Sequence, residues 1–158
     1  YAIQDEYLAR AEYKVIMDAY GEQRPFINIM KAEGVHVQRL LPLFTVYGVT
    51  VPEDTALEHT VKPDSLAAAY EAGVTAEVNN IAMYEAFLKQ EDLPDDVRAV
   101  FEALTRASGN HLRAFEQNVS KLGMGNQNRA AGKGQQNYSN PNADENSEPL
   151  QGRGRRRK

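Results

Sequence analysis

The feature of this chain with the clearest chemical potential is a Glu-x-x-His pair, Glu33 and His36, inside an apolar helical pattern. Apolar residues at alternating steps of four and three predict a helix over residues 25–47 with one face turned to a core. Glu33 falls on that face, and His36 lies about one turn further on, so both side chains can reach one point between packed helices. A carboxylate removed from water is unfavourable unless a cation or hydrogen-bond donor meets it. The pair is therefore the first candidate for a functional site.

Three further apolar stripes carry polar interruptions of the same kind. Glu6 interrupts the first stripe, Glu77 and Asn80 the third, and Ser108 and His111 the fourth. In a helical bundle the stripes face one another, so these groups can share one interior site. Carboxylates and imidazoles suit iron, manganese or zinc, and the chain has no cysteine for a thiolate site. The pattern therefore predicts a buried metal site.

The elements that must position these groups are four helices joined by turn signals. We expect them at about residues 2–20, 25–47, 65–91 and 95–122. Gly21, Gly48 and Gly123 are placed to end the first, second and fourth helices. Either Asp64 or Ser65 can cap the third helix. Pro42 lies inside the second helix, and because the stripe continues beyond it we expect a kink.

The segment over residues 49–63 has no helical stripe and contains Pro52 and Pro63. Extended, about 15 residues can span up to ~50 Å, enough to run along a ~30 Å helix. A connection of this length is expected in a four-helix bundle with one long crossover. The predicted fold class is therefore all-α, a four-helix bundle with one long crossover.

Helix heights give a further expectation about the site. Measured from the turn between the first two helices, Glu6 and Glu33 differ in height by roughly 9 Å at 1.5 Å per residue. Glu77 and His111 differ by only about 3 Å. The half of the site from the third and fourth helices is thus predicted to be in register. The half from the first two helices is less secure, although a staggered turn between them could absorb part of the difference.

Charge divides the chain into a predicted bundle, 1–122, and a predicted disordered tail, 123–158. The first part has 11 basic and 19 acidic residues and the second 7 basic and 3 acidic residues. The Arg-rich end at 153–158 could contact nucleic acid or an anionic surface. The helix faces could form a homo-oligomer. With no apolar run of about 20 residues, the chain is expected to be soluble, either cytoplasmic or the mature form of an exported protein.

Three motifs within residues 2–119 carry a resemblance to a known group of proteins. They are Glu6-Tyr7-Leu8-Ala9-Arg10 with Tyr13, Glu33-x-x-His36, and Ser108-x-Asn110-His111-Leu112-Arg113-Ala114-Phe115. By these motifs the chain resembles the ferritin-like superfamily, which includes ferritins and rubrerythrins. Within it, the chain is similar to a prokaryotic ferritin-like domain family of unknown function.

The resemblance implies a ferritin-like bundle that holds iron, as a di-iron centre or a reduced form of one, and acts as an oxidase or peroxidase. The metal-ligand positions that it implies are Glu6, Glu33, His36, Glu77 and His111. It places Tyr13 beside them, and Tyr84, Asn80 and Ser108 lie on the same seams. In ferritins and rubrerythrins, a glutamate stands where this chain has Ser108. That departure leaves one carboxylate fewer for a second metal ion.

Readings without a metal also fit these residues. Glu6 could form an ion pair with Arg10 one turn away, and Glu33 with His36 could form a buried hydrogen-bonded group with Tyr13 or Tyr84. In that case the chain would be a non-catalytic bundle, acting as a structural or binding module with a basic tail.

Overall fold

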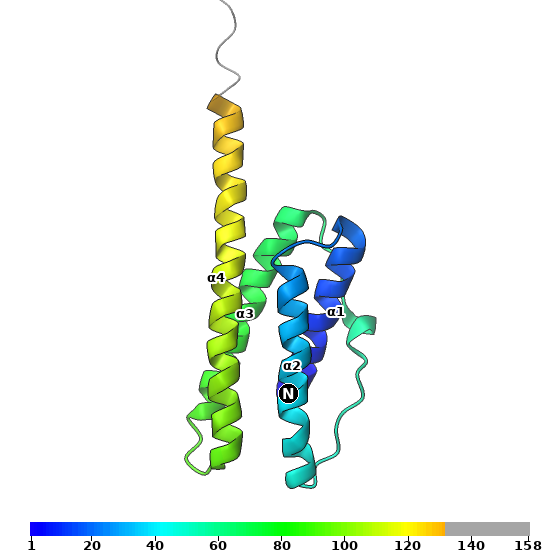
Figure 1. The fold of residues 1–158 in the computed structure, drawn as a ribbon, viewed down its shortest axis with the longest axis vertical. Coiled ribbons are helices and arrows are strands. Elements are labelled where there is room, and N and C mark those ends of the chain that lie inside the picture. Colours follow the sequence, from blue (N-terminus) through cyan, green and yellow to red (C-terminus); the bar gives the residue numbers. More distant parts are fainter. Residues whose placement is uncertain (132–158) are drawn as a thin grey trace, which may run out of the picture.

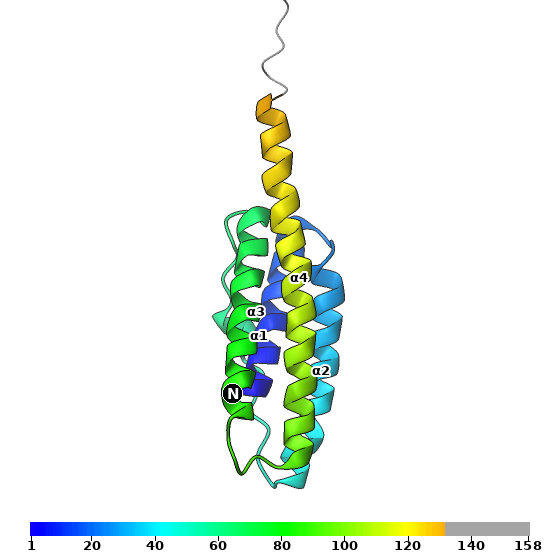
Figure 2. The same cartoon turned by 90° about the vertical axis from the view of Figure 1, so that its left-hand side faces the viewer.

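The fold was analysed in a computed structural model that describes residues 1–131, with side chains described up to Gly123. It contains four helices and one short 3-10 helix, η1 (Ala56–His59). The four helices are α1 (Ala2–Tyr20), α2 (Phe26–Val46), α3 (Leu66–Leu88) and α4 (Asp95–Ala131). They pack side by side as a bundle (Figures 1 and 2). The prediction of an all-α four-helix bundle is confirmed, and the Arg-rich end lies outside the described residues.

Local sequence signals set most of the helix boundaries. Gly21 and Gly48 have φ values of 85° and 62°, a region that glycine enters without steric penalty, and each follows the end of a helix. The Ser65 side chain accepts a hydrogen bond from the Ala68 backbone N–H at 3.1 Å and so caps α3. α2 continues past Pro42 to Val46, as the stripe predicted.

α4 does not end at Gly123, which corrects the prediction from sequence. The helix continues to Ala131 and projects beyond the other three (Figure 2). Gly123 is not among the glycines with positive φ, so it does not adopt the left-handed conformation of a C-terminal stop. A glycine in a helical conformation costs only about 1 kcal/mol relative to alanine, which is not enough to end a helix.

The crossover connects the end of α2 to the start of α3 at the opposite end of the bundle (Figure 1). Its middle forms η1, which sequence did not predict, and η1 packs against α1. The Tyr20 hydroxyl donates a hydrogen bond to the Pro63 carbonyl near the end of the crossover. The long crossover is thus confirmed, and it follows the outside of α1.

The apolar core forms two clusters with a polar layer between them. The first contains Tyr13, Ile16, Phe26, Tyr70 and Phe115, among others. The second contains Ile3, Val37, Leu40, Tyr84 and Leu104. In every helix, the predicted metal ligands fall between these two sets along the chain. Apolar packing above and below therefore holds the polar side chains at one level. None of the helices in the described part of the chain has the length and apolar character needed to cross a membrane.

Candidate metal centre

The turn between α1 and α2 brings the first half of the site into register. The ring of Phe26, the first residue of α2, lies 5.8 Å from the ring of Tyr13 rather than beside Tyr20 at the end of α1. This stagger of seven residues corresponds to about 10 Å along the helix axis. Figure 1 shows α1 extending beyond the start of α2. The expected mismatch of about 9 Å between Glu6 and Glu33 is therefore removed, and that expectation was wrong.

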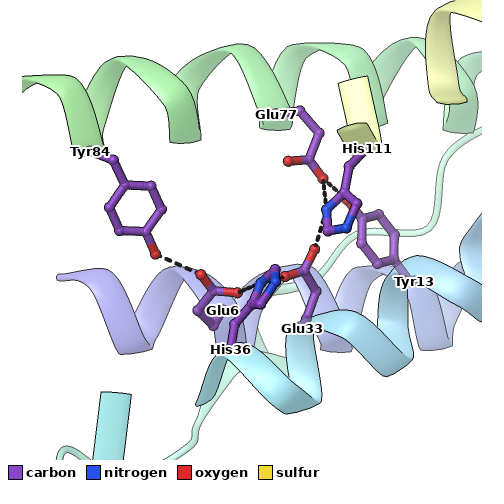
Figure 3. A network of polar contacts seen from close by, with 7 residues as sticks. All are labelled: Glu6, Tyr13, Glu33, His36, Glu77, Tyr84 and His111. Atoms are coloured by element: carbon purple, nitrogen blue, oxygen red, sulfur yellow. Dashed lines mark hydrogen bonds and ion pairs between the residues drawn. The ribbon is translucent and has the colours of Figure 1, made fainter. Parts of the chain in front are cut away.

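Glu6 of α1 meets Glu33 and His36 of α2 in a first group (Figure 3). The Nδ1 atom of His36 lies 3.0 Å from Oε2 of Glu6 and 2.5 Å from Oε2 of Glu33. All three residues are buried, and each offers a ligand atom within 4.8 Å of the others. This group could hold a metal ion.

A second group joins Glu33 to Glu77 of α3 and His111 of α4. The Nδ1 atom of His111 lies 3.0 Å from Oε1 of Glu33 and 3.4 Å from Oε1 of Glu77. Here too the ligand atoms lie within 4.8 Å of one another. Glu33 belongs to both groups, with one carboxylate oxygen facing each histidine. The two imidazole rings lie 5.6 Å apart between centroids.

Two tyrosines cross-link the outer carboxylates. Tyr84 of α3 donates a 2.6 Å hydrogen bond to Oε1 of Glu6, and Tyr13 of α1 donates a 3.1 Å hydrogen bond to Oε1 of Glu77. Each tyrosine lies seven residues after a site glutamate on its own helix and bonds the glutamate of the other helix. This Glu-x6-Tyr spacing occurs twice in the sequence, and it is the signal that could have paired each tyrosine with the glutamate of the other helix.

Three buried polar atoms in this site lack a hydrogen-bond partner in the described part of the chain. They are Oε1 of Glu33, Oε2 of Glu77 and Nδ1 of His111. The His111 nitrogen is close to the Glu33 oxygen, yet the pair does not have hydrogen-bond geometry. Unpaired buried polar groups are rare and unfavourable. A cation in the second group would provide a partner for Oε1 of Glu33 and Nδ1 of His111, which lie 3.0 Å apart, so the residues fit a metal ion.

The charges of the metal-free site balance through protonated histidines. Burial disfavours a charged imidazole, but the contacts with Glu33 and Glu6 outweigh it and raise the pKa of His36 to about 9. The contacts with Glu33 and Glu77 likewise raise the pKa of His111 to about 9 against the effect of burial. At neutral pH both rings are therefore in the positively charged form, with a proton on each nitrogen. A metal ion would have to displace the proton from the nitrogen that it binds.

The pKa values of Glu6 and Glu33 are shifted in opposite directions. Burial and the nearby Glu33 raise the pKa of Glu6 to about 7, although His36 acts against this. Burial also opposes ionisation of Glu33, but its contacts with both histidines prevail and lower its pKa to about 2. Glu33 is thus the site's permanent anion, which suits its position between the two groups.

Asn80 and Ser108 are buried on the expected seams, at 6% and 4% exposure. No side-chain hydrogen bond joins either residue to the described site. Asp5, which the sequence analysis missed, is half-buried, and its pKa is raised to about 6 by burial and by the charges of Glu77 and Glu33. Its position beside Glu6 is off the apolar stripe, so periodicity gave no signal for it.

Close packing of α3 on α4 supports the second group. A Cβ at Gly73 would lie 2.7–2.8 Å from ring atoms of Phe115. Gly73 lies one turn before Glu77, and Phe115 one turn after His111. The absence of a side chain at Gly73 therefore allows α3 and α4 to pack closely beside the second group.

Comparison with known proteins gives a family without an assigned activity. Residues 1–139 match a family described as an uncharacterized protein domain, DUF2202. The chain is also similar to the crystal structure of hypothetical protein MJ0754 from Methanococcus jannaschii DSM 2661. The TM-score is 0.68, the sequence identity is 25%, and the match covers 77% of each chain. No curated protein matches the chain.

Proposed function

The chain belongs to the DUF2202 family, and we propose that it is an iron-binding protein with a ferritin-like centre that can hold two metal ions. The observation that carries the proposal is the place of Glu33, whose two carboxylate oxygens belong to two different ligand groups. A carboxylate shared in this way is expected where two cations lie close together. Manganese and zinc accept the same ligands, so identity must be decided by experiment.

The residues divide into ligands and supports. Glu6 and His36 would hold one ion, Glu77 and His111 the other, and Glu33 would contact both. The ligand set is that of the di-iron carboxylate bundles with one carboxylate missing, because Ser108 precedes His111 where those bundles have glutamate. Iron bound by these oxygen and nitrogen ligands would supply redox chemistry with dioxygen or peroxide.

The surrounding residues have roles that do not require a metal. Tyr13 and Tyr84 each donate a hydrogen bond to one carboxylate oxygen and so fix which oxygen remains for a metal ion. The apolar clusters on both sides keep bulk water away from the site. The two hydrogen bonds orient Glu6 and Glu77 before any ion arrives.

The proposal is tested by metal analysis of the purified chain, before and after incubation with ferrous iron without oxygen. We expect between one and two irons per chain and a rise in melting temperature on loading. Glu33→Gln keeps the size of the side chain and removes the charge, so it should reduce iron content by at least half. Glu58→Gln in η1, which is exposed and outside both groups, is the matched control and should bind like the parent chain.

Two results would contradict the proposal. One is less than about 0.1 metal per chain after loading with iron, manganese or zinc, without a shift in melting temperature. The other is an unchanged iron content in Glu33→Gln, which would show that iron binds elsewhere. Binding of manganese or zinc but not of iron would change the identity of the metal and leave the proposed ligands unchanged.

A further inference from the structure

The hollow between α2 and α4 lies outside the two ligand groups and has an unusual set of polar groups. It is an open hollow of about 390 Å³ at the surface, where Arg39, Arg106 and Asn110 are exposed. α2 and α4 lie side by side in both views of the bundle (Figures 1 and 2). The polar side chains that line it are His36, Arg39, Arg106 and Asn110. Small side chains on both helices, Ala32, Ala103 and Ala107, leave the space between them.

The two arginines have no neutralising partner in the described part of the chain. Neither has a carboxylate oxygen within 4 Å, although Glu102 lies one turn before Arg106 on the same helix. No aspartate or glutamate lines the hollow. Two guanidinium groups therefore face the same space in a part of the chain whose sequence is otherwise strongly acidic.

Asn110 contributes a side-chain amide to the lining of this space. Its Oδ1 atom already accepts a hydrogen bond from the Arg113 guanidinium. The amide NH₂ of Asn110 therefore remains available. Guanidinium groups also donate and cannot accept.

His36 is the link between the hollow and the buried site. Its Nδ1 atom is turned to Glu6 and Glu33. The other ring nitrogen, Nε2, has no hydrogen-bond partner in the described part of the chain. It is also absent from the set of buried atoms without a partner, so it is not closed off from the hollow. Nε2 carries a proton in the imidazolium form and also when Nδ1 binds a metal. In both states the ring can donate a hydrogen bond outward.

We propose that the hollow between α2 and α4 is a binding site for a small oxyanion, a phosphate or a carboxylate. All of its polar groups can donate, and none needs to accept. Arginine side chains pair with the oxygens of phosphates and carboxylates through two parallel hydrogen bonds. The anion would contact the outer edge of His36, whose inner edge faces the ligand groups. The site would therefore act on the metal centre through that one ring.

The anion site can be tested without any metal, so its outcome is independent of the proposed iron centre. The chelator-treated chain is titrated with inorganic phosphate and, separately, with acetate, at constant ionic strength. Binding is followed by the ¹⁵N resonances of the arginine and histidine side chains. We expect saturable shifts of His36 Nε2 and of both arginines. The tighter of the two anions identifies whether the site prefers phosphate or carboxylate.

Three variants and a control distinguish binding in the hollow from general attraction of anions to surface charge. Arg39→Gln and Arg106→Gln should each weaken binding by about tenfold or more, the effect of losing one charge-assisted hydrogen-bond pair. Ala107→Leu should block binding by filling the hollow without changing the charge. Arg10→Gln, which removes the same charge from a different face, is the control and should change the affinity less than twofold.

The inference is overturned if neither anion produces saturable shifts at up to tens of millimolar, or if Arg10→Gln weakens binding as much as Arg39→Gln. It is also overturned if Ala107→Leu binds like the parent chain, since the anion would then lie elsewhere.

Discussion

The stability of the metal-free chain should fall as pH rises from about 6 to 9. His36 and His111 have ordinary pKa values of 6.5 and folded-state values of about 9. A group whose pKa is raised by folding stabilises the fold fully below its unfolded pKa, and that contribution is lost as pH rises through the folded pKa. Glu6, raised from 4.5 to about 7, contributes in the same direction. Glu33, lowered to about 2, loses its contribution only in acid.

The size of the effect follows from the two histidines. A rise from 6.5 to about 9 corresponds to about 3 kcal/mol for each ring, at about 1.36 kcal/mol per pH unit. Both rings contact Glu33, so their contributions are not additive, and we expect about 3–4 kcal/mol for the pair. For a domain of this size, that loss lowers the melting temperature by about 10 °C.

Thermal unfolding of the chelator-treated chain, followed by far-ultraviolet circular dichroism between pH 5.5 and 9.5, measures this loss directly. His36→Gln should reduce the pH dependence, because only His111 then keeps the raised pKa. His59→Gln, in the exposed end of η1, should leave it as in the parent chain. With saturating metal the trend should reverse, because metal binding displaces the histidine protons more easily as pH rises. A metal-free melting temperature that is constant or rising between pH 6 and 9 would refute the charge arrangement described for the site.

Four further substitutions test the packing and the composition of the site. Tyr84→Phe removes a 2.6 Å hydrogen bond to a buried carboxylate, so urea unfolding should show a loss of about 1–3 kcal/mol; an unchanged midpoint would contradict the bond. Gly73→Ala places a Cβ 2.7 Å from an aromatic ring, and this overpacking should outweigh the gain in helix propensity, with a net loss of about 1–2 kcal/mol. A Cβ added at Gly34 would have no neighbour within 4 Å, so Gly34→Ala should instead stabilise the chain by up to about 1 kcal/mol. Equal effects at the two glycines would argue against the close contact of Gly73 with Phe115. Ser108→Glu adds the carboxylate that the ligand set lacks, so it should destabilise the metal-free chain and increase the iron retained after dialysis; equal retention would mean that position 108 does not face the centre.

Periodicity predicted the fold and the composition of the site because both depend on which residues share a helix face. A glutamate within an apolar stripe, such as Glu33 or Glu77, has to lie inside the bundle, and the structure places it there. The Ser65 cap and the turn at Gly21 were predictable for a similar reason, since each signal acts within a few residues.

The features that sequence did not predict depend on contacts between distant segments. The stagger of α2 against α1 follows from the packing of Phe26 on Tyr13, and no helical repeat encodes the path of the turn between them. Tyr13 and Tyr84 were expected beside the site, but the carboxylate that each one bonds was not predicted, because Tyr84 and Glu6 are 78 residues apart in sequence. Asp5 was missed since its influence on the site is electrostatic and does not require a position on the stripe.

The crossover has a consequence for how the chain could be divided. It passes outside the bundle, and all five proposed ligands lie in the helical hairpins on either side of it, with Glu6, Glu33 and His36 before it and Glu77 and His111 after it. A break in its exposed stretch near Glu53 would cut no helix and separate no ligand from its own hairpin. The two fragments would then meet across the polar layer, with Glu33 of one facing His111 of the other. In such a split chain, metal binding would hold two separate polypeptides together, and their affinity for each other would depend on the ion that they share.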